Sequence, residues 1–217
     1  MQAKTVSQVL VWSRWLRMAH WSLAISSLGL IATGWLMSED SVAATTAGEL
    51  HYLLAGILLP ALLLRLYLLF FGKGTDHLTD CEPNSHRLYQ AWQVIRFYLT
   101  LGKAPLPKWF SHNPLWGPLY IALFFILTLV TASGLLLLNE WHLLGPISML
   151  SLHQLCYQFI LVFTLLHIPA SFSHDLSGKS GDISAMINGY RVFDIGENST
   201  DSTQGVSLST LLKQVKK

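Results

Sequence analysis

Two histidines, His153 and His167, lie inside the last long apolar stretch of the chain. No Asp, Glu, Lys or Arg occurs between Glu140 and Asp175, and a helix of roughly 20 apolar residues can cross a bilayer. The two histidines are 14 residues apart, so on a helix they share nearly one face and lie about 21 Å apart along the axis. Polar groups inside a membrane are costly and usually functional. The spacing therefore suggests two metal centres, one near each membrane surface, with hydrogen bonding to neighbouring helices as the alternative.

The composition is that of a membrane protein with short loops. Of the 217 residues, 52% are hydrophobic and 12% are charged, against about 25% charged in a typical soluble domain. The net charge of +2 and the absence of a basic run argue against a nucleic-acid partner. Cys81 and Cys156 lie in different regions and no Cys-x-x-Cys-His occurs, which excludes covalently attached c-type haem and a disulfide framework.

Four segments are long and apolar enough to span a membrane, and the second carries a single charge, Arg65. The first is too long for the apolar region of a signal peptide. We therefore expect an all-α fold, a transmembrane four-helix bundle over residues 1–195 with no strands. The composition of Asn198–Gly205 predicts a flexible cytoplasmic tail over 196–217. The expected spans are about 18–38, 50–72, 114–139 and 147–174.

The polar connection from Lys73 to Lys108 contains one amphipathic segment. Its apolar residues recur at helical spacing, which predicts a helix that lies in the membrane interface. These residues are Leu88, Trp92, Ile95 and Leu99.

The basic residues predict the orientation in the membrane. None of the 14 Lys and Arg residues falls in the loops at 39–49 and 139–150. Because cytoplasmic loops are enriched in Lys and Arg, this distribution predicts the orientation of a multi-pass membrane protein. Both termini and the interfacial helix would face the cytoplasm.

This orientation places four histidines at two depths. His51 and His153 lie near the outer ends of the second and fourth spans, and His20 and His167 lie near the inner ends of the first and fourth. Bis-imidazole ligation of b-type haem in a helical bundle needs ligands from different helices at one level. The sequence therefore predicts two b haems, with His51/His153 and His20/His167 as axial ligands.

Other polar residues are expected near the inner haem. Arg65 follows His51 by 14 residues, so it lies deeper on nearly the same face. Its guanidinium would pair with haem propionates or a quinone head group, or reach the cytoplasmic surface. His112, which opens the third span, would hydrogen-bond at the helix start or contact the haem edge. Arg17 lies at the same end, as does His174, which we expect to be a surface histidine, with proton carrier or propionate partner as alternatives.

Several segments resemble the b-type cytochrome subunit of membrane-bound nickel–iron hydrogenases, in the bacterial cytochrome b561-like group. The resemblance covers about residues 10 to 195. It is carried by Arg17-Met-Ala-His20-Trp21 with Thr33-Gly34, by His51, Gly56 and Arg65-Leu-Tyr with Phe71-Gly72, by His112-Asn-Pro-Leu115, by the His153–His167 interval, and by Ile183-Ser-Ala-Met-Ile-Asn-Gly-Tyr-Arg191.

The resemblance implies an electron-transfer subunit of a quinone-linked oxidoreductase complex, docked to a periplasmic hydrogenase-like partner. It also implies the four paired histidines as haem ligands. The outer loops are short for a hydrogenase subunit, so another periplasmic dehydrogenase, reductase or cytochrome is an alternative partner. We expect Trp141 and His142 to anchor the partner and quinone to react near the inner haem. Two rival functions are a stand-alone cytochrome b561-type quinone oxidoreductase that uses a small oxidant such as superoxide, and a haem-free anchor or proton-relay protein.

Overall fold

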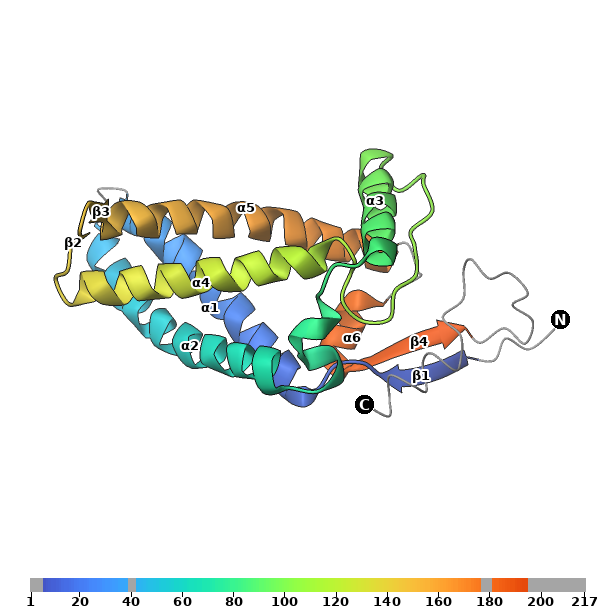
Figure 1. The fold of residues 1–217 in the computed structure, drawn as a ribbon. Coiled ribbons are helices and arrows are strands. Elements are labelled where there is room, and N and C mark those ends of the chain that lie inside the picture. Colours follow the sequence, from blue (N-terminus) through green and yellow to red (C-terminus); the bar gives the residue numbers. More distant parts are fainter. Residues whose placement is uncertain (1–5, 39–41, 177–180, 195–217) are drawn as a thin grey trace. The chain divides into compact units, whose positions relative to one another are not determined.

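A computed structural model describes residues 6–38, 42–176 and 181–194 (Figure 1). It is dominated by four helices that are long and apolar enough to cross a membrane, which confirms the predicted all-α transmembrane class. These are α1 (Arg14–Ser38), α2 (Ala44–Phe71), α4 (Trp116–Leu138) and α5 (Met149–Leu176). The shorter elements are the 3-10 turns η1 (Gly74–Asp76) and η2 (Leu78–Asp80) and the helices α3 (Ser85–Leu99) and α6 (Asp182–Asn188).

The helices extend beyond the uncharged stretches of the sequence. Helix α1 begins at Arg14 rather than near residue 18, and α2 begins at Ala44, so Glu49 is helical and not part of a loop. Charged side chains near a helix end reach water while the backbone continues, so the loss of hydrophobicity does not mark the helix end. The predicted flexible tail, 196–217, lies outside the described residues.

The chain forms two compact units, and it passes between them within each of the four long helices. The helix unit comprises Met18–Tyr67 and Ala122–His167. The loop unit comprises the described residues of Met1–Arg17, Leu68–Ile121 and Ile168–Lys217.

In the helix unit, each of the four long helices contacts two others through side chains. Helices α1 and α2 meet at Gly29, where a Cβ atom would lie 2.6 Å from Leu54. Side-chain contacts also join α2 to α4, α4 to α5, and α5 to α1. The unit is therefore a closed ring of four helices, with many large apolar side chains exposed outward, among them Leu53, Leu63, Phe125, Val162 and Leu165.

A tight hairpin connects α4 to α5 in the helix unit. Strand β2 (Leu143–Leu144) pairs antiparallel with β3 (Ile147–Ser148). Gly145 in the turn has a φ of 59°, a conformation that favours glycine because it lacks a Cβ atom.

In the loop unit, α3 has two apolar faces. Val94 and Phe97 pack against Leu106 and Trp109 in a small core. Leu88, Trp92 and Leu99 are instead exposed. A buried face opposite an exposed aliphatic and aromatic stripe is the pattern expected of a helix in the membrane interface.

The expectation of no strands is wrong for both units, because the loop unit contains a strand pair as well. Strand β1 (Val6–Leu10) pairs antiparallel with β4 (Tyr190–Asp194), and Figure 1 shows them as neighbouring arrows. The backbone N–H groups of Val11 and Trp12 also donate to the Gly189 carbonyl at 2.8 and 3.1 Å. The pairing joins opposite ends of the chain, so no local sequence pattern reveals it.

Candidate functional site

The structure brings His51 of α2 beside His153 of α5. Their ring centroids are 6.3 Å apart and their planes are inclined at 59°. Both side chains lie in the helix unit and both are partly buried.

A second pair, His20 of α1 and His167 of α5, has nearly the same geometry. The ring centroids are 6.5 Å apart and the planes are inclined at 63°. Phe163 stacks on His167 at 5.4 Å, and Trp21 meets His20 edge-on at 5.3 Å. The four histidines therefore form two facing pairs, and each pair joins α5 to a different helix.

The spacing of each pair fits a single metal ion between the rings. Imidazole nitrogens bind metals at about 2.0–2.1 Å, so two rings on opposite sides of one ion would have centroids about 6 Å apart. Among the residues that the structure describes, no cluster of three or more His, Cys, Asp or Glu side chains surrounds such an ion. Two axial imidazoles without further protein ligands suit an iron whose remaining ligands come from a macrocycle, as in haem.

The His51–His153 pair also lines an apolar cavity. Its volume is about 260 Å³, and aliphatic side chains such as Leu30, Leu59 and Leu127 form much of its wall. A Cβ atom on Gly134 would lie 3.2 Å from the His153 ring, and one on Gly34 would lie 3.6 Å from the His51 ring. Glycine therefore gives each imidazole room beside a neighbouring helix backbone.

Hydrogen bonds hold the His51 and His153 rings through the same nitrogen atom, Nδ1. His51 Nδ1 lies 2.9 Å from Thr33 Oγ1. His153 Nδ1 lies 3.1 Å from Ser133 Oγ and 3.0 Å from the Val130 carbonyl oxygen. Because Nδ1 is engaged in both rings, Nε2 is the nitrogen that would bind a metal. Neither Ser133 nor the contact of Thr33 with His51 was predicted from the sequence, although both residues are hydroxyl side chains followed by a glycine, and that recurrence was a usable signal.

Arg65 of α2 is buried in the helix unit. Its side chain is 4% exposed, and its guanidinium lies 4.9 Å from the centre of the Phe124 ring. A cation over an aromatic face is attracted by the ring quadrupole. The structure therefore places Arg65 among protein side chains, and not at the surface as a snorkelling arginine would be.

Arg17 and His112 have partners within the loop unit. The guanidinium of Arg17 donates to the Ile187 carbonyl. His112 Nδ1 lies 2.6 Å from Asp80 Oδ2. Burial lowers the pKa of His112, but contacts with Asp80 and Cys81 outweigh burial and raise it above the ordinary value.

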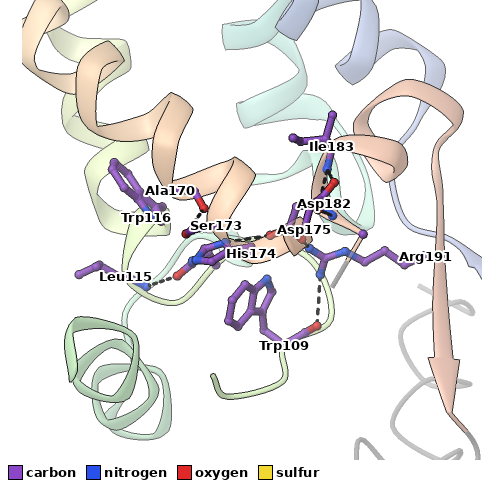
Figure 2. A network of polar contacts seen from close by, with 12 residues as sticks. Trp109, Leu115, Trp116, Ala170, Ser173, His174, Asp175, Asp182, Ile183 and Arg191 are labelled. Carbon is purple, nitrogen blue, oxygen red and sulfur yellow. Dashed lines mark hydrogen bonds and ion pairs between the residues drawn. The ribbon is translucent and has the colours of Figure 1, made fainter. Parts of the chain in front are cut away.

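His174 is buried at the centre of a polar network in the loop unit (Figure 2), which contradicts the expectation of a surface histidine. Its Nε2 lies 2.9 Å from the Tyr98 hydroxyl and its Nδ1 lies 3.1 Å from Asp182 Oδ2. Asp182 also forms an ion pair with the buried Arg191, which donates to the Trp109 carbonyl at 3.2 Å. The network ties α6 and β4 to α5 and to the α3–α4 connection.

The donors and acceptors in this network fix where its protons lie. The indole N–H of Trp116 can only donate, and it lies 3.0 Å from the Tyr98 hydroxyl. A carboxylate can only accept, so His174 Nδ1–H donates to Asp182. With a neutral ring, His174 Nε2 would then accept the proton of the Tyr98 hydroxyl. Burial raises the pKa of Tyr98 despite its hydrogen bonding with Trp116 and Asn113.

Comparison with known proteins places the chain in a family. The family model described as "Prokaryotic cytochrome b561" matches residues 11–189. Similar proteins include a probable Ni/Fe-hydrogenase B-type cytochrome subunit of Cupriavidus necator, 26% identical over 88% of this chain and 89% of the relative. One of the same name from Azotobacter vinelandii is 27% identical over 85% and 89% of the two chains. A probable Ni/Fe-hydrogenase 1 B-type cytochrome subunit of Escherichia coli K12 is 24% identical over 84% and 90%.

No solved structure matches the chain. The family model nevertheless extends from Val11, just after β1, to Gly189, just before β4, and takes in all four long helices and both histidine pairs. The chain therefore belongs to the prokaryotic cytochrome b561 family.

Proposed function

We propose that this chain holds two b haems and passes electrons between a periplasmic hydrogenase-type partner and the quinone pool. Membership of the family makes it a membrane b-type cytochrome that acts in electron transfer and binds haem b. The number of haems, the quinone and the partner belong to the proposal.

Two facing histidine pairs are the observation that carries the proposal. With centroids 6.3 and 6.5 Å apart, His51 with His153 and His20 with His167 would each supply both axial ligands of one haem. The haem supplies a one-electron iron couple, and the protein supplies ligation, orientation and apolar surroundings. A single haem would leave one pair of imidazoles inside the membrane unexplained, at a cost that is seldom met without function.

A haem count with single variants tests this scheme. The purified chain should contain two b haems in a pyridine haemochrome assay. His51→Ala and His153→Ala should remove one spectral component, and His20→Ala and His167→Ala should remove the other. His142→Ala, at an exposed histidine of the α4–α5 hairpin, is the matched control and should keep both. One haem per chain, or loss of the same component from His20→Ala and His153→Ala, would overturn the scheme.

The distribution of basic residues supports the orientation. The segments 39–49 and 139–150, which contain the α1–α2 and α4–α5 connections, have neither Lys nor Arg, so the positive-inside rule assigns them to the periplasm of a bacterial inner membrane. Both termini would then be cytoplasmic, and His51 and His153 would hold the haem nearer the periplasm.

The α4–α5 hairpin is the surface that we propose for the partner. Trp141, Leu143, Leu144 and Ile147 are all at least half exposed there, and exposed apolar clusters mark interaction sites. The relatives from three bacteria are named as hydrogenase cytochrome subunits. A hydrogenase bound at this hairpin would deliver electrons to the outer haem.

Arg65 is the residue that we propose for the quinone. It is a buried cation in the unit that holds both histidine pairs, and a guanidinium can stabilise negative charge on a quinone oxygen as it is reduced. Arg17 and His112, expected near the same haem, contact Ile187 and Asp80 in the loop unit. Arg65 carries this part of the proposal because it belongs to the unit that holds both histidine pairs.

The quinone assignment has its own test. In membranes that retain both haems, Arg65→Leu should slow quinone reduction and leave haem reduction by the partner intact, and Arg65→Lys should restore part of the rate. Normal quinone turnover in Arg65→Leu would place the quinone elsewhere.

A further inference from the structure

We propose that Thr33 and Ser133 are positioning residues that fix the tautomer of the His51 and His153 rings and set the reduction potential of the haem between them. The inference rests on the proposed function, because that function makes His51 and His153 the axial ligands.

The proton positions around Thr33 follow from its neighbours. Thr33 is buried, and its hydroxyl lies 2.8 Å from the Gly29 carbonyl in the preceding turn of α1 and 2.9 Å from His51 Nδ1. A hydroxyl has one proton and a carbonyl can only accept. The Thr33 proton therefore goes to Gly29, and the Thr33 oxygen accepts the Nδ1–H of His51. This tautomer leaves the Nε2 of His51 with the free lone pair that a metal requires.

Ser133 and Val130 impose the same tautomer on His153. His153 Nδ1 lies 3.0 Å from the Val130 carbonyl, which requires the proton on Nδ1. The Ser133 hydroxyl is 1% exposed and donates to the same carbonyl at 3.0 Å. Its oxygen, 3.1 Å from His153 Nδ1, then presents lone pairs to the ring. His153 therefore has two acceptors for one N–H group.

The contacts of Thr33 with His51 and of Ser133 with His153 have the same local geometry. In each, a hydroxyl residue on one helix accepts from a histidine on the next, and the following residue is a glycine that leaves space for the imidazole. Thr33 and Gly34 of α1 serve His51 of α2 in this way, and Ser133 and Gly134 of α4 serve His153 of α5.

This arrangement has an electronic consequence. A ligating imidazole that donates its other N–H to an acceptor becomes a more basic ligand, and a more basic ligand stabilises the oxidised metal and lowers the reduction potential. Thr33 is the acceptor that the structure gives to His51, so Thr33→Val removes that effect without changing the side-chain shape. Ser133→Ala leaves the Val130 carbonyl in place, so it should have a smaller effect.

Potentiometric titration of the purified two-haem protein tests the inference. Thr33→Val should shift the potential of the outer haem upward, Ser133→Ala should shift it less in the same direction, and Thr33→Ser should restore the wild-type value. The inner haem should keep its potential in all three variants, which provides an internal control. The electron paramagnetic resonance signal of the oxidised outer haem should change with the potential, because the ring is no longer held.

Two results would overturn the inference. The first is a reduction potential of the outer haem that Thr33→Val leaves unchanged. The second is an equal shift of that potential in Thr33→Val and Thr33→Ser, which would assign the effect to packing. If Thr33→Val purifies without the outer haem, Thr33→Ala is the second variant, because it removes the hydroxyl without placing a methyl group there, and the same outcomes apply. A pyridine haemochrome count on each sample separates the two proposals: one haem in the wild type contradicts the proposed function, whereas two haems with unshifted potentials contradict only the roles of Thr33 and Ser133.

Discussion

Replacing Gly34 or Gly134, the two glycines beside the His51 and His153 rings, with alanine should affect the proposed outer haem differently. Glycine is less favourable than alanine in a helix interior by about 1 kcal/mol, so both substitutions gain a similar amount from the helix. At Gly34 the new Cβ atom would lie 3.6 Å from the His51 ring, which is an ordinary contact. Gly34→Ala should therefore be neutral or stabilising.

At Gly134 the new Cβ atom would lie 3.2 Å from His153 Cε1 and 3.5 Å from its Nδ1. The best carbon–carbon separation is about 3.5–4.0 Å, so the ring must move by a few tenths of an ångström. His153 cannot move freely, because Val130 and Ser133 hold its Nδ1. Overpacking of this kind costs about 1–3 kcal/mol. The gain in helix propensity on replacing glycine with alanine is similar in the two variants and cancels in their comparison. Gly134→Ala should therefore be less stable than Gly34→Ala by about 1–3 kcal/mol.

The assay is the retention of the outer haem during denaturant titration in detergent, followed by its absorption band and its electron paramagnetic resonance signal. Gly134→Ala should release this haem at lower denaturant and alter its signal, while the inner haem serves as the reference. Equal stability of the two variants, or greater damage from Gly34→Ala, would refute the argument from the Cβ distances.

Three further predictions concern the loop unit and the hairpin. Asp182 pairs with the buried Arg191, and leaving a buried charge without its partner costs about 3–5 kcal/mol, so Asp182→Ala and Arg191→Ala should each lower thermal stability and expose the β1–β4 amides to hydrogen exchange. The double variant should lose less stability than the sum of the single variants, and strict additivity would contradict the pairing. Because the pKa of His112 is raised in the folded protein, protonation of His112 should stabilise the fold fully below the ordinary histidine pKa, and this stabilisation should disappear as the pH rises through the raised value. Thermal unfolding at several pH values should show the loss in the wild type but not in His112→Gln. Identical pH profiles of the two proteins would count against the prediction. The Trp141→Ala, His142→Ala double variant should retain less of the partner on co-purification at unchanged haem content, because exposed aromatic side chains are frequent anchors of interfaces; undiminished retention would move the docking surface elsewhere.

The class of the fold could be predicted from the sequence alone. The four spans could be predicted because the length of an apolar helix and the absence of charge are local properties, set by the thickness of a bilayer. The helical period also predicted that His153 and His167 share one face of α5. Depth along the helices was enough to propose which histidines pair, and the structure indeed places His51 by His153 and His20 by His167.

Which polar groups contact one another could not be predicted from the sequence and is known only from the folded structure. The pairing of β1 with β4, the contact of Asp80 with His112, and the burial of His174 between Tyr98 and Asp182 all join residues that are distant in sequence or separated by turns. The same holds for the hydroxyl of Thr33 against His51, which depends on how α1 and α2 face each other. Hydrophobicity and period determine how each helix lies in a membrane, but hydrogen bonds depend on positions to within a few tenths of an ångström, and only the packing of neighbouring elements fixes positions that closely.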